Sequence, residues 1–288
     1  MNLRRRLIPY GLLGPGAIWL ALFFVVPMYF MGELALRTGT FAEGFSSAFE
    51  LANFPDSLEG RGSQLARTFF YSGVATLLAL LIAYPLAYAI AVRASPRWRL
   101  VLLFAVIAPF FTTYLIRTIA WKTILSDESP IVGLLQTVAL IPDDGRVLAT
   151  GGAVIAGLTY TFLPFMILPI YASLERIDLS LIEAAKDLYA SARQAFLKVT
   201  LPLTMPGIVA GVLLTFIPAS GDYVNAEILG GAGQKMIGNK IQSLYLQDRN
   251  YPEAAALSFL MMAVILLVVI FYLRAAGTQA FMGDEDER

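Results

Sequence analysis

The chain has 288 residues, of which 58% are hydrophobic and only 15% are charged. A soluble domain of this length needs more charge to cover its surface, so the composition excludes an ordinary soluble protein and indicates a chain that lies mostly in lipid. The 21 basic and 21 acidic residues balance, which argues against nucleic-acid binding. Cysteine and histidine are both absent, so we expect no disulfides, no catalytic site and no cofactor.

Six stretches are long and apolar enough to cross a membrane. About 20 apolar residues are needed, because only a helix satisfies its own backbone hydrogen bonds across roughly 30 Å of hydrocarbon. In chain order, the predicted spans are residues 7–32, 68–92, 100–121, 147–174, 199–221 and 254–273. The sequence therefore predicts an all-α polytopic membrane protein with six transmembrane helices, in a single transmembrane domain over residues 1–288.

The two ends of the chain carry opposite charges. Arg4 to Arg6 precede the first span, as they would in a signal peptide, but the apolar run is too long for one and no convincing cleavage site follows. We therefore expect an uncleaved anchor. The acidic tail Gly283 to Arg288 is typical of a solvated end.

The distribution of Lys and Arg predicts the orientation. Six spans place both termini on one side, and a cytoplasmic N-terminus gives that side 12 of the 21 Lys and Arg residues. The other nine are spread over the longer loops 37–67, 117–146 and 226–253. We therefore expect a multi-pass protein of the inner (plasma) membrane with both termini in the cytoplasm.

The loop between the fourth and fifth spans, residues 175–202, is predicted to be helical. Ser180 with Glu183, and Ser191 with Gln194, have the spacing of a capping box, in which each partner satisfies an orphan amide of the other. Two such starts predict two short helices with a bend between them. Their apolar and polar faces suit amphipathic helices that either lie at the membrane interface or present charge to a partner.

This loop resembles the EAA loop of ABC importer permeases. The resemblance rests on Glu183-Ala184-Ala185 and on Val199-x-Leu201-Pro202, at the spacing of that family. It implies a cytoplasmic coupling helix that sits in a groove of a separate ATPase and transmits ATP-driven closure to the pore. The residues so implied are Glu183, Ala184, Ala185, Lys186, Asp187, Leu188, Tyr189, Ala190 and Ser191.

Two positions depart from the family pattern. Val199 stands where isoleucine is usual, which changes little. Tyr189 stands where the family normally has glycine, the residue that adopts a left-handed turn at little cost. We therefore expect the bend to shift toward Ala190 and Ser191 or to be unusually tight.

Two further segments resemble the spermidine/putrescine subgroup of these permeases. One runs from Pro109 to Trp121, and the other from Phe216 through Asp222 and its following loop to Ile241. The resemblance implies that the chain forms half of a pathway for a polyamine or a similar small organic solute. It also implies three partners: a cytoplasmic ATPase dimer, an external substrate-binding protein and a second permease subunit, which we expect to be a related but different chain, with a homodimer left open.

Asp222, directly after the long apolar fifth span, is the candidate for attracting an ammonium group. Tyr223, Tyr114 and Trp121 could add aromatic faces, and a cation over such a face gains about 0.5 to 2 kcal/mol. The alternatives are that these rings form an interfacial belt and that Asp222 pairs with Arg117 inside the protein. These five residues are the candidates for the substrate pathway.

Other classes of function are disfavoured. The sequence contains no Gly-x-x-x-x-Gly-Lys-Ser/Thr phosphate loop, so another chain must hydrolyse ATP. An ion- or proton-coupled secondary carrier is the main alternative, but it needs carboxylates inside its spans, and these spans contain almost none. An intramembrane enzyme would need His, Cys or paired carboxylates in the membrane.

Overall fold

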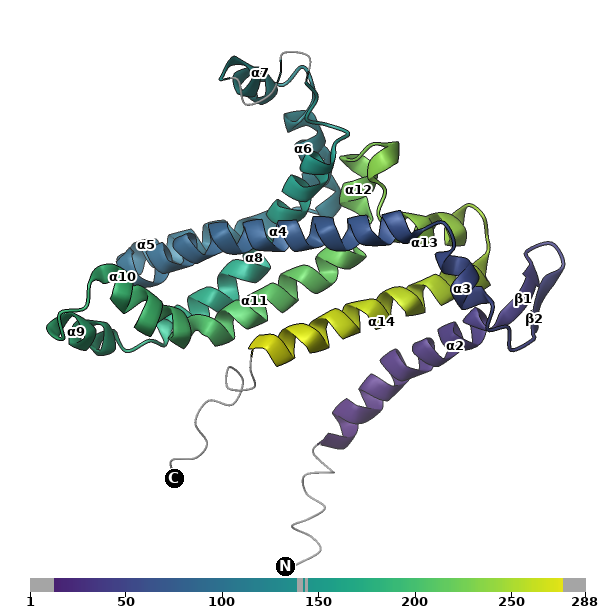
Figure 1. Cartoon of the computed structure of the whole chain (residues 1–288), viewed down its shortest axis with the longest axis horizontal. Helices are drawn as coiled ribbons and strands as arrows, with labels where there is room; N and C mark the ends of the chain where they lie inside the picture. Colours follow the sequence, from purple (N-terminus) through teal and green to yellow (C-terminus); the bar gives the residue numbers. More distant parts are fainter. Residues whose placement is uncertain (1–12, 139–141, 143–144, 277–288) are drawn as a thin grey trace, which may run out of the picture. The chain divides into compact units, whose positions relative to one another are not determined.

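The computed structural model describes residues 13–138, 142 and 145–276, which divide into two compact units (Figure 1). In this part of the chain the first unit contains residues 13–62 and 240–264, and the second contains residues 63–239 and 265–276. Three predicted features lie outside the described residues: the start of the first span, Arg4 to Arg6 and the acidic tail. That both units act as one transmembrane domain stays a prediction.

The described chain contains five helices long and apolar enough to cross a membrane, and a bent pair supplies a sixth if it counts as one span. The five are Leu13–Ala35, Gly62–Arg93, Gly151–Glu175, Ala192–Gly221 and Tyr251–Ala275, and the pair is Pro96–Phe111 with Tyr114–Ile124. The mostly helical membrane fold predicted from the sequence is confirmed, and each predicted span overlaps one of these helices.

The first unit joins the first span to the beginning of the last one. Its elements are η1 (Ala21–Val25), α2 (Val26–Ala35), β1 (Arg37–Thr40), β2 (Gly44–Ser47), α3 (Asn53–Leu58), the end of α13 (Ile237–Leu246) and the first half of α14 (Tyr251–Ala276). Buried Ala35, Ala255 and Ala256 form its small core, against which Phe54 and Phe259 pack. Alanines at the contact allow α2 and α14 to approach closely.

The β1–β2 hairpin follows the first span directly. The strands are antiparallel, with Thr38 opposite Ser46. Gly39 has a φ of +118°, and a Cβ at this position would lie 2.2 Å from the carbonyl oxygen of Gly44, so only glycine fits. Asn53 anchors the segment that follows, because its side-chain amide donates to the carbonyls of Ala35 and Arg37, both at 2.9 Å.

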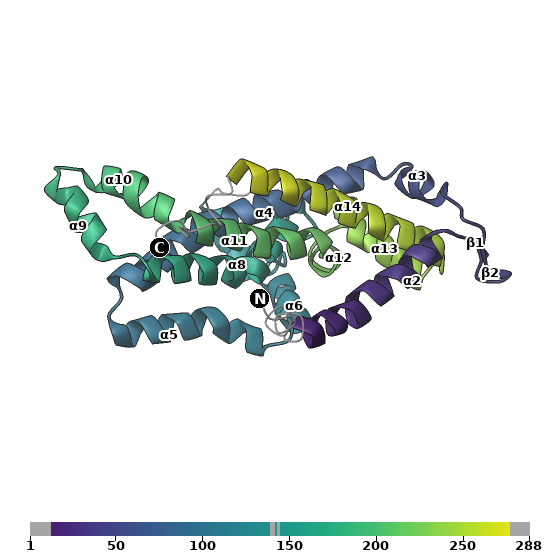
Figure 2. The same ribbon diagram turned by 90° about the horizontal axis from the view of Figure 1, so that it is seen from below.

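The second unit holds the other spans. Its elements are α4 (Gly62–Tyr88), η2 (Ala89–Arg93), α5 (Pro96–Ile107), η3 (Ala108–Phe111), α6 (Tyr114–Ile124), α7 (Pro130–Thr137), α8 (Gly151–Glu175), α9 (Leu179–Asp187), α10 (Ala192–Ala195), η4 (Phe196–Thr200), α11 (Leu201–Gly221), α12 (Val224–Ile228), η5 (Ala232–Gln234) and the second half of α14. Helices α8 and α11 lie side by side (Figure 2). A Cβ at Gly207 would lie 2.3 Å from Ser173 Oγ, so glycine permits this close contact.

Helix α4 packs through a row of small residues. Ala75, Ala79, Ala83 and Ala87 recur at every fourth position and are all fully buried. Residues four apart share one helix face, so this alanine row brings the α4 backbone close to its neighbours. Two side-chain hydrogen bonds also join α4 to α11: Ser72 and Ser220 lie 3.0 Å apart, and Tyr84 and Thr204 lie 2.9 Å apart.

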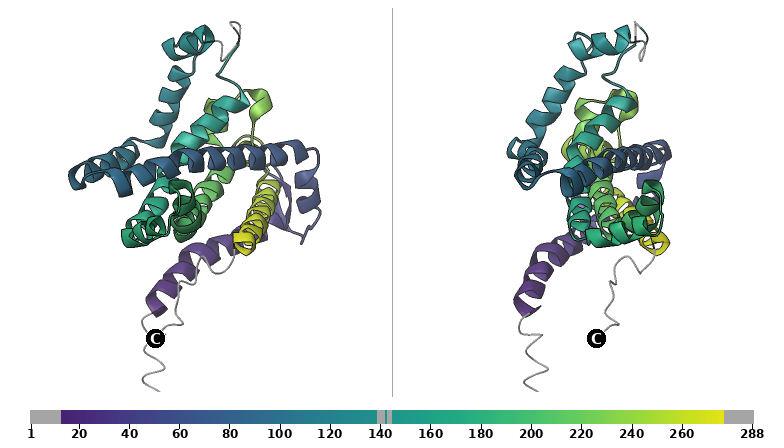
Figure 3. Two further views of the ribbon diagram at one scale, coloured as in Figure 1. Left: turned by 60° about the vertical axis from the view of Figure 1, so that its left-hand side comes forward. Right: turned by 90° about the vertical axis from the view of Figure 1, so that its left-hand side faces the viewer.

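The third span is not the continuous helix that the sequence predicts. Helix α6 departs from the α5–η3 segment at an angle of 98° (Figure 3). Pro109 has no amide proton to continue the helical hydrogen bonds, and the amide of Thr112 closes a tight turn onto the Pro109 carbonyl at 3.1 Å. Thr112 and Thr113 are extended, a conformation that β-branched side chains favour, and this separates the two helices.

Candidate functional site

The two short helices between the fourth and fifth spans are each capped. Helix α9 has Asp178 as its N-cap, and the Asp178 carboxylate accepts from the amide of Ser180 at 2.9 Å. This hydrogen bond lowers the pKa of Asp178 below its ordinary value. The predicted Ser180–Glu183 capping box is therefore wrong, because an aspartate two residues earlier takes the N-cap role.

The second predicted capping box is confirmed. The amide of Ser191 donates to Gln194 Oε1 at 2.9 Å, and the amide of Gln194 donates back to Ser191 Oγ at 3.3 Å. These reciprocal bonds satisfy two orphan donors at the start of α10. The second helix of the loop therefore begins at a position fixed by the sequence.

The bend between the two helices lies at Tyr189. Its φ is +61°, its amide donates to the Lys186 carbonyl at 2.9 Å, and the Ala190 amide donates to the Ala185 carbonyl at 3.0 Å. This is a Schellman motif with tyrosine in the position that usually holds glycine. The expected shift of the bend toward Ala190 and Ser191 is wrong, because Tyr189 itself adopts the left-handed conformation at a cost of about 1 to 2 kcal/mol.

We call residues Glu183–Ser191 the coupling surface. Leu188 is 82% exposed and Tyr189 is 97% exposed. Glu183, Lys186 and Asp187 are also exposed, and they form none of the salt bridges found in the described part of the chain. In Figure 2, α9 and α10 extend past the ends of α8 and α11. The coupling surface thus combines unpaired charges with two protruding apolar side chains.

Phe196 connects the coupling surface to the membrane helices. Its ring meets that of Tyr84 edge to face, with centroids 5.6 Å apart, and that of Tyr88 at 6.5 Å. Both tyrosines lie on α4, and aromatic pairs at such distances stabilise beyond their buried area. Phe196, which directly follows α10, is thus packed against α4.

The break in the third span brings two of the predicted pathway residues together. Tyr114, the first residue of α6, donates its hydroxyl proton to Asp222 Oδ2. Asp222 follows α11 and is 8% exposed, and its Oδ1 accepts from the amide of Asn225 at 2.8 Å. The Asn225 side-chain amide donates to the Tyr114 hydroxyl at 2.8 Å and to Asp222 Oδ2 at 3.4 Å. We call Tyr114, Asp222 and Asn225 the polar latch.

The polar latch changes the interpretation of Asp222. Its carboxylate is buried and accepts from a hydroxyl, a backbone amide and a side-chain amide, so little capacity remains for a transported ammonium group. The latch instead fixes the start of α6 to α12. The sequence analysis missed Asn225, and its only sequence signal is the Asp-x-x-Asn spacing after the end of a span.

The other three pathway candidates lie elsewhere. Arg117 does not pair with Asp222; its guanidinium lies 5.2 Å from the centroid of the Phe110 ring, and its buried Nε has no hydrogen-bond partner among the described residues. Trp121 packs on Tyr160, with ring centroids 5.2 Å apart. The Tyr223 side chain is 39% exposed. The structure thus brings together two of the five candidates.

A second polar cluster follows the latch on α12. Glu227 forms an ion pair with Lys235, and the side-chain amide of Asn239 donates to the same Glu227 oxygen at 2.8 Å. The hydrogen bond from Lys235 holds the pKa of Glu227 below its ordinary value. Glu227 therefore stays ionised, and its charge is balanced locally by Lys235.

Comparison with known proteins decides the family. The model of the family described as "Binding-protein-dependent transport system inner membrane component" matches residues 15–278. The chain belongs to this family. It is accordingly a multi-pass protein of the inner membrane and the membrane component of a transport system, not an enzyme. This membership also decides against the secondary-carrier alternative.

Relatives within the family share sequence along most of the chain. The spermidine/putrescine transport system permease protein PotB of Haemophilus influenzae is 37% identical over 258 residues, which cover 89% of this chain and 90% of that protein. PotB of Escherichia coli is 37% identical over 259 residues, covering 90% and 94%.

A solved structure confirms the fold. A bacterial alginate ABC transporter in complex with alginate pentasaccharide-bound periplasmic protein contains a chain that matches with a TM-score of 0.74 at 19% identity. The match covers 98% of each chain. At this level of identity the similarity concerns the fold.

Proposed function

We propose that the chain is the pore-forming permease subunit of an ABC importer for polyamines, driven by a cytoplasmic ATPase that binds the coupling surface. The observation that carries the proposal is the exposed, unpaired coupling surface, which is capped at both helices and joined to α4 through Phe196. Closure of the ATPase would move α9 and α10, and the Phe196 contacts would pass this movement to α4.

The orientation of the spans belongs to the same proposal. Arg99 bonds to Glu175 at 3.3 Å and to the Ala91 carbonyl at 2.6 Å, so the basic turn after the second span lies beside the end of the fourth span, where the coupling loop begins. Arg93, Arg97 and Arg99 thus share one end of the second unit with the coupling loop. A cytoplasmic location for that end agrees with the positive-inside rule and, with six spans, would put both termini in the cytoplasm.

We assign the translocation pathway to the region of the break in the third span. Broken helices are common at the binding sites of transporters, because irregular backbone at membrane depth is tolerated only where it lines a cavity or is buried in protein. In this region the polar latch shapes the pathway, and the exposed Tyr223 ring and the break itself are available to the solute. A second permease subunit, expected to be a related chain, would complete the pore.

The substrate class follows from the relatives. Two relatives that match 89% and 90% of the chain are named spermidine/putrescine permeases. An external binding protein would select the solute, as the complex with a periplasmic protein in the alginate system illustrates for that transporter.

The test is uptake into proteoliposomes that contain the full chain with its partner permease and ATPase. We expect uptake of radiolabelled spermidine or putrescine only when ATP is supplied on the side of the coupling surface and the external binding protein is supplied on the opposite side. Omission of ATP and replacement by a non-hydrolysable analogue are the controls. ATP-independent uptake that follows an imposed proton gradient would contradict the proposal, and ATP-dependent uptake of a different solute would overturn only the substrate class.

A further inference from the structure

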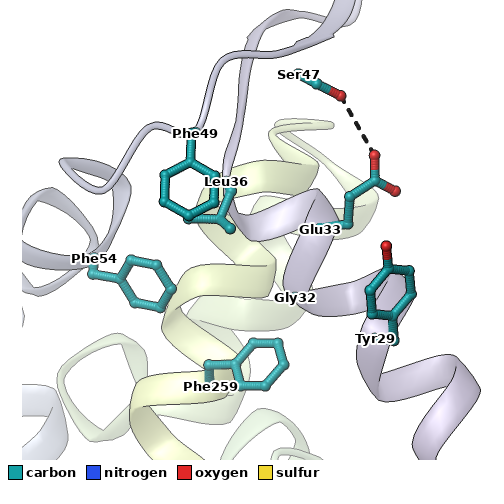
Figure 4. A pocket seen from close by; sticks show the side chains of 8 residues that line it. All are labelled: Tyr29, Gly32, Glu33, Leu36, Ser47, Phe49, Phe54 and Phe259. Atoms are coloured by element: carbon teal, nitrogen blue, oxygen red, sulfur yellow. Dashed lines mark hydrogen bonds between the residues drawn. The ribbon is translucent and has the colours of Figure 1, made fainter.

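The first unit contains a cavity of about 470 Å³ that the proposed transport function does not use (Figure 4). Its walls are mostly apolar: Leu36 at the end of α2, Phe49 in the segment after β2, Phe54 in α3 and Phe259 in α14. Among the described residues, Glu33 is the one charged residue that lines it, and in Figure 4 its carboxylate lies on one side of the cavity, near Ser47. The cavity is therefore a hydrophobic space with a polar edge.

At the polar edge, Glu33 and its partner Arg37 each keep an atom that is free to form a hydrogen bond. Glu33 Oε1 accepts from Arg37 Nη2 at 2.7 Å, from Arg37 Nε at 3.3 Å and from Ser47 Oγ at 3.4 Å. In the described part of the chain, Glu33 Oε2 accepts no hydrogen bond and Arg37 Nη1 donates none. Both side chains are about one-third exposed. Glu33, which lines the cavity, thus keeps a free carboxylate oxygen, and Arg37, its ion-pair partner, keeps a free guanidinium nitrogen.

The cavity lies where two apolar spans meet their first charged residues. Glu33 is the first charged residue after the apolar first span, and Glu253 is the last charged residue before the apolar run of α14. Phe259 lies six residues beyond Glu253, about 9 Å deeper along the helix. We therefore expect the apolar walls to reach into the hydrocarbon and the Glu33–Arg37 pair to lie at the level of the lipid head groups.

We infer that this cavity binds an aminophospholipid such as phosphatidylethanolamine. The primary ammonium group would donate to Glu33 Oε2, the phosphate would accept from Arg37 Nη1, and part of an acyl chain would fill the space between Leu36, Phe54 and Phe259. This arrangement matches each group of a zwitterionic head to a residue of opposite charge. Phosphatidylcholine has the same phosphate and acyl chains, but its quaternary ammonium group cannot donate a hydrogen bond to Glu33.

The test compares lipids that differ only in the head group. Native mass spectrometry of the full chain in detergent would measure binding of phosphatidylethanolamine and phosphatidylcholine with identical acyl chains. We expect about tenfold stronger binding of phosphatidylethanolamine, because hydrogen bonds to a charged group are among the stronger ones. Glu33→Gln keeps the shape of the side chain but removes its charge, so this variant should bind the two lipids about equally.

Two further variants separate the head group from the acyl chain. Gly32 lines the cavity, and a Cβ at this position would lie in ordinary contact with Phe259, 3.5 Å away, so Gly32→Leu should fill the cavity and weaken binding of both lipids alike. Glu43→Gln removes an exposed carboxylate in the turn between β1 and β2, outside the cavity, and should change neither affinity. A rise in melting temperature with added phosphatidylethanolamine, in wild type but not in Glu33→Gln, gives a second measurement.

Equal binding of the two lipids by the wild-type chain would overturn the inference, as would an unchanged preference in Glu33→Gln. Displacement of phosphatidylethanolamine by micromolar spermidine would also overturn it, since the cavity would then be a polyamine site. None of these outcomes depends on whether the chain transports polyamines.

Discussion

Charge reversal at Glu183 is expected to abolish ATP-dependent uptake while the chain folds and inserts normally. Glu183 is exposed and has no salt-bridge partner in the described part of the chain, so replacing it by lysine should change the free energy of unfolding by no more than about 0.5 kcal/mol. At an interface, however, placing a like charge against a partner that accommodates a carboxylate costs several kcal/mol. We expect uptake to fall more than tenfold and the ATPase to be lost on purification.

The matched control for this prediction is Glu128→Lys. Glu128 is also exposed, but it lies in the segment between α6 and α7, far along the chain from the coupling surface. This variant should retain both uptake and the bound ATPase. Melting temperatures of both variants should match the wild-type value. Full uptake by Glu183→Lys, with the ATPase still bound, would remove this residue from the coupling interface.

Substitutions in the polar latch are expected to have the second large effect on stability and uptake. Asp222→Ala leaves the Tyr114 hydroxyl and the Asn225 amide without their buried acceptor, which should destabilise the chain by about 1 to 3 kcal/mol. We expect a lower melting temperature and at least a tenfold loss of uptake, because α6 is released from α12. Tyr114→Phe removes one donor to the same carboxylate and should act in the same direction with a smaller effect.

A double-mutant cycle separates the latch from a direct role of Asp222 in cation binding. If Tyr114 and Asp222 act together, the changes in unfolding free energy for Tyr114→Phe and Asp222→Ala should be non-additive by about 0.5 to 3 kcal/mol. Asp222→Asn keeps an acceptor for the Asn225 amide, so its stability should stay near wild type. A large rise in KM for spermidine in Asp222→Asn, with additive stabilities, would instead favour the cation site that the sequence predicts.

The spans were predictable because membrane crossing imposes a simple rule on composition. Long apolar runs bounded by charges identified all six segments, and the helix ends differ from the predictions by several residues. The break in the third span was not predicted. It depends on how Pro109, Thr112 and Thr113 combine, and prolines are tolerated elsewhere in this chain within continuous helices, as Pro164 and Pro169 are in α8.

The N-caps of the two loop helices could be predicted from the sequence only in part. The Ser191–Gln194 box formed as predicted because both bonds are local. At the first helix the prediction took Ser180 as the N-cap, whereas the structure has Asp178, two residues earlier, and both residue types are favoured at that position. The bend at Tyr189 shows that two backbone hydrogen bonds and a following capping box outweigh a cost of about 1 to 2 kcal/mol for a left-handed tyrosine.

Contacts between distant segments were the least predictable part. Asp222 and Tyr114 were both candidates, but their hydrogen bond joins residues 108 positions apart. Nothing in the sequence chooses tyrosine over Arg117 as the partner of the carboxylate, because that choice depends on the bend before α6. Asn225 was missed for the same reason.

The most direct measurement is the side of the membrane on which the coupling surface lies. The chain has no cysteine, so Ser191→Cys introduces a single thiol, and Ser191 is exposed. We expect a membrane-impermeant maleimide to label this thiol in inside-out vesicles and not in right-side-out ones, and the bound ATPase to protect it. Labelling in right-side-out vesicles would place the coupling surface outside the cell, where no ATPase could move it.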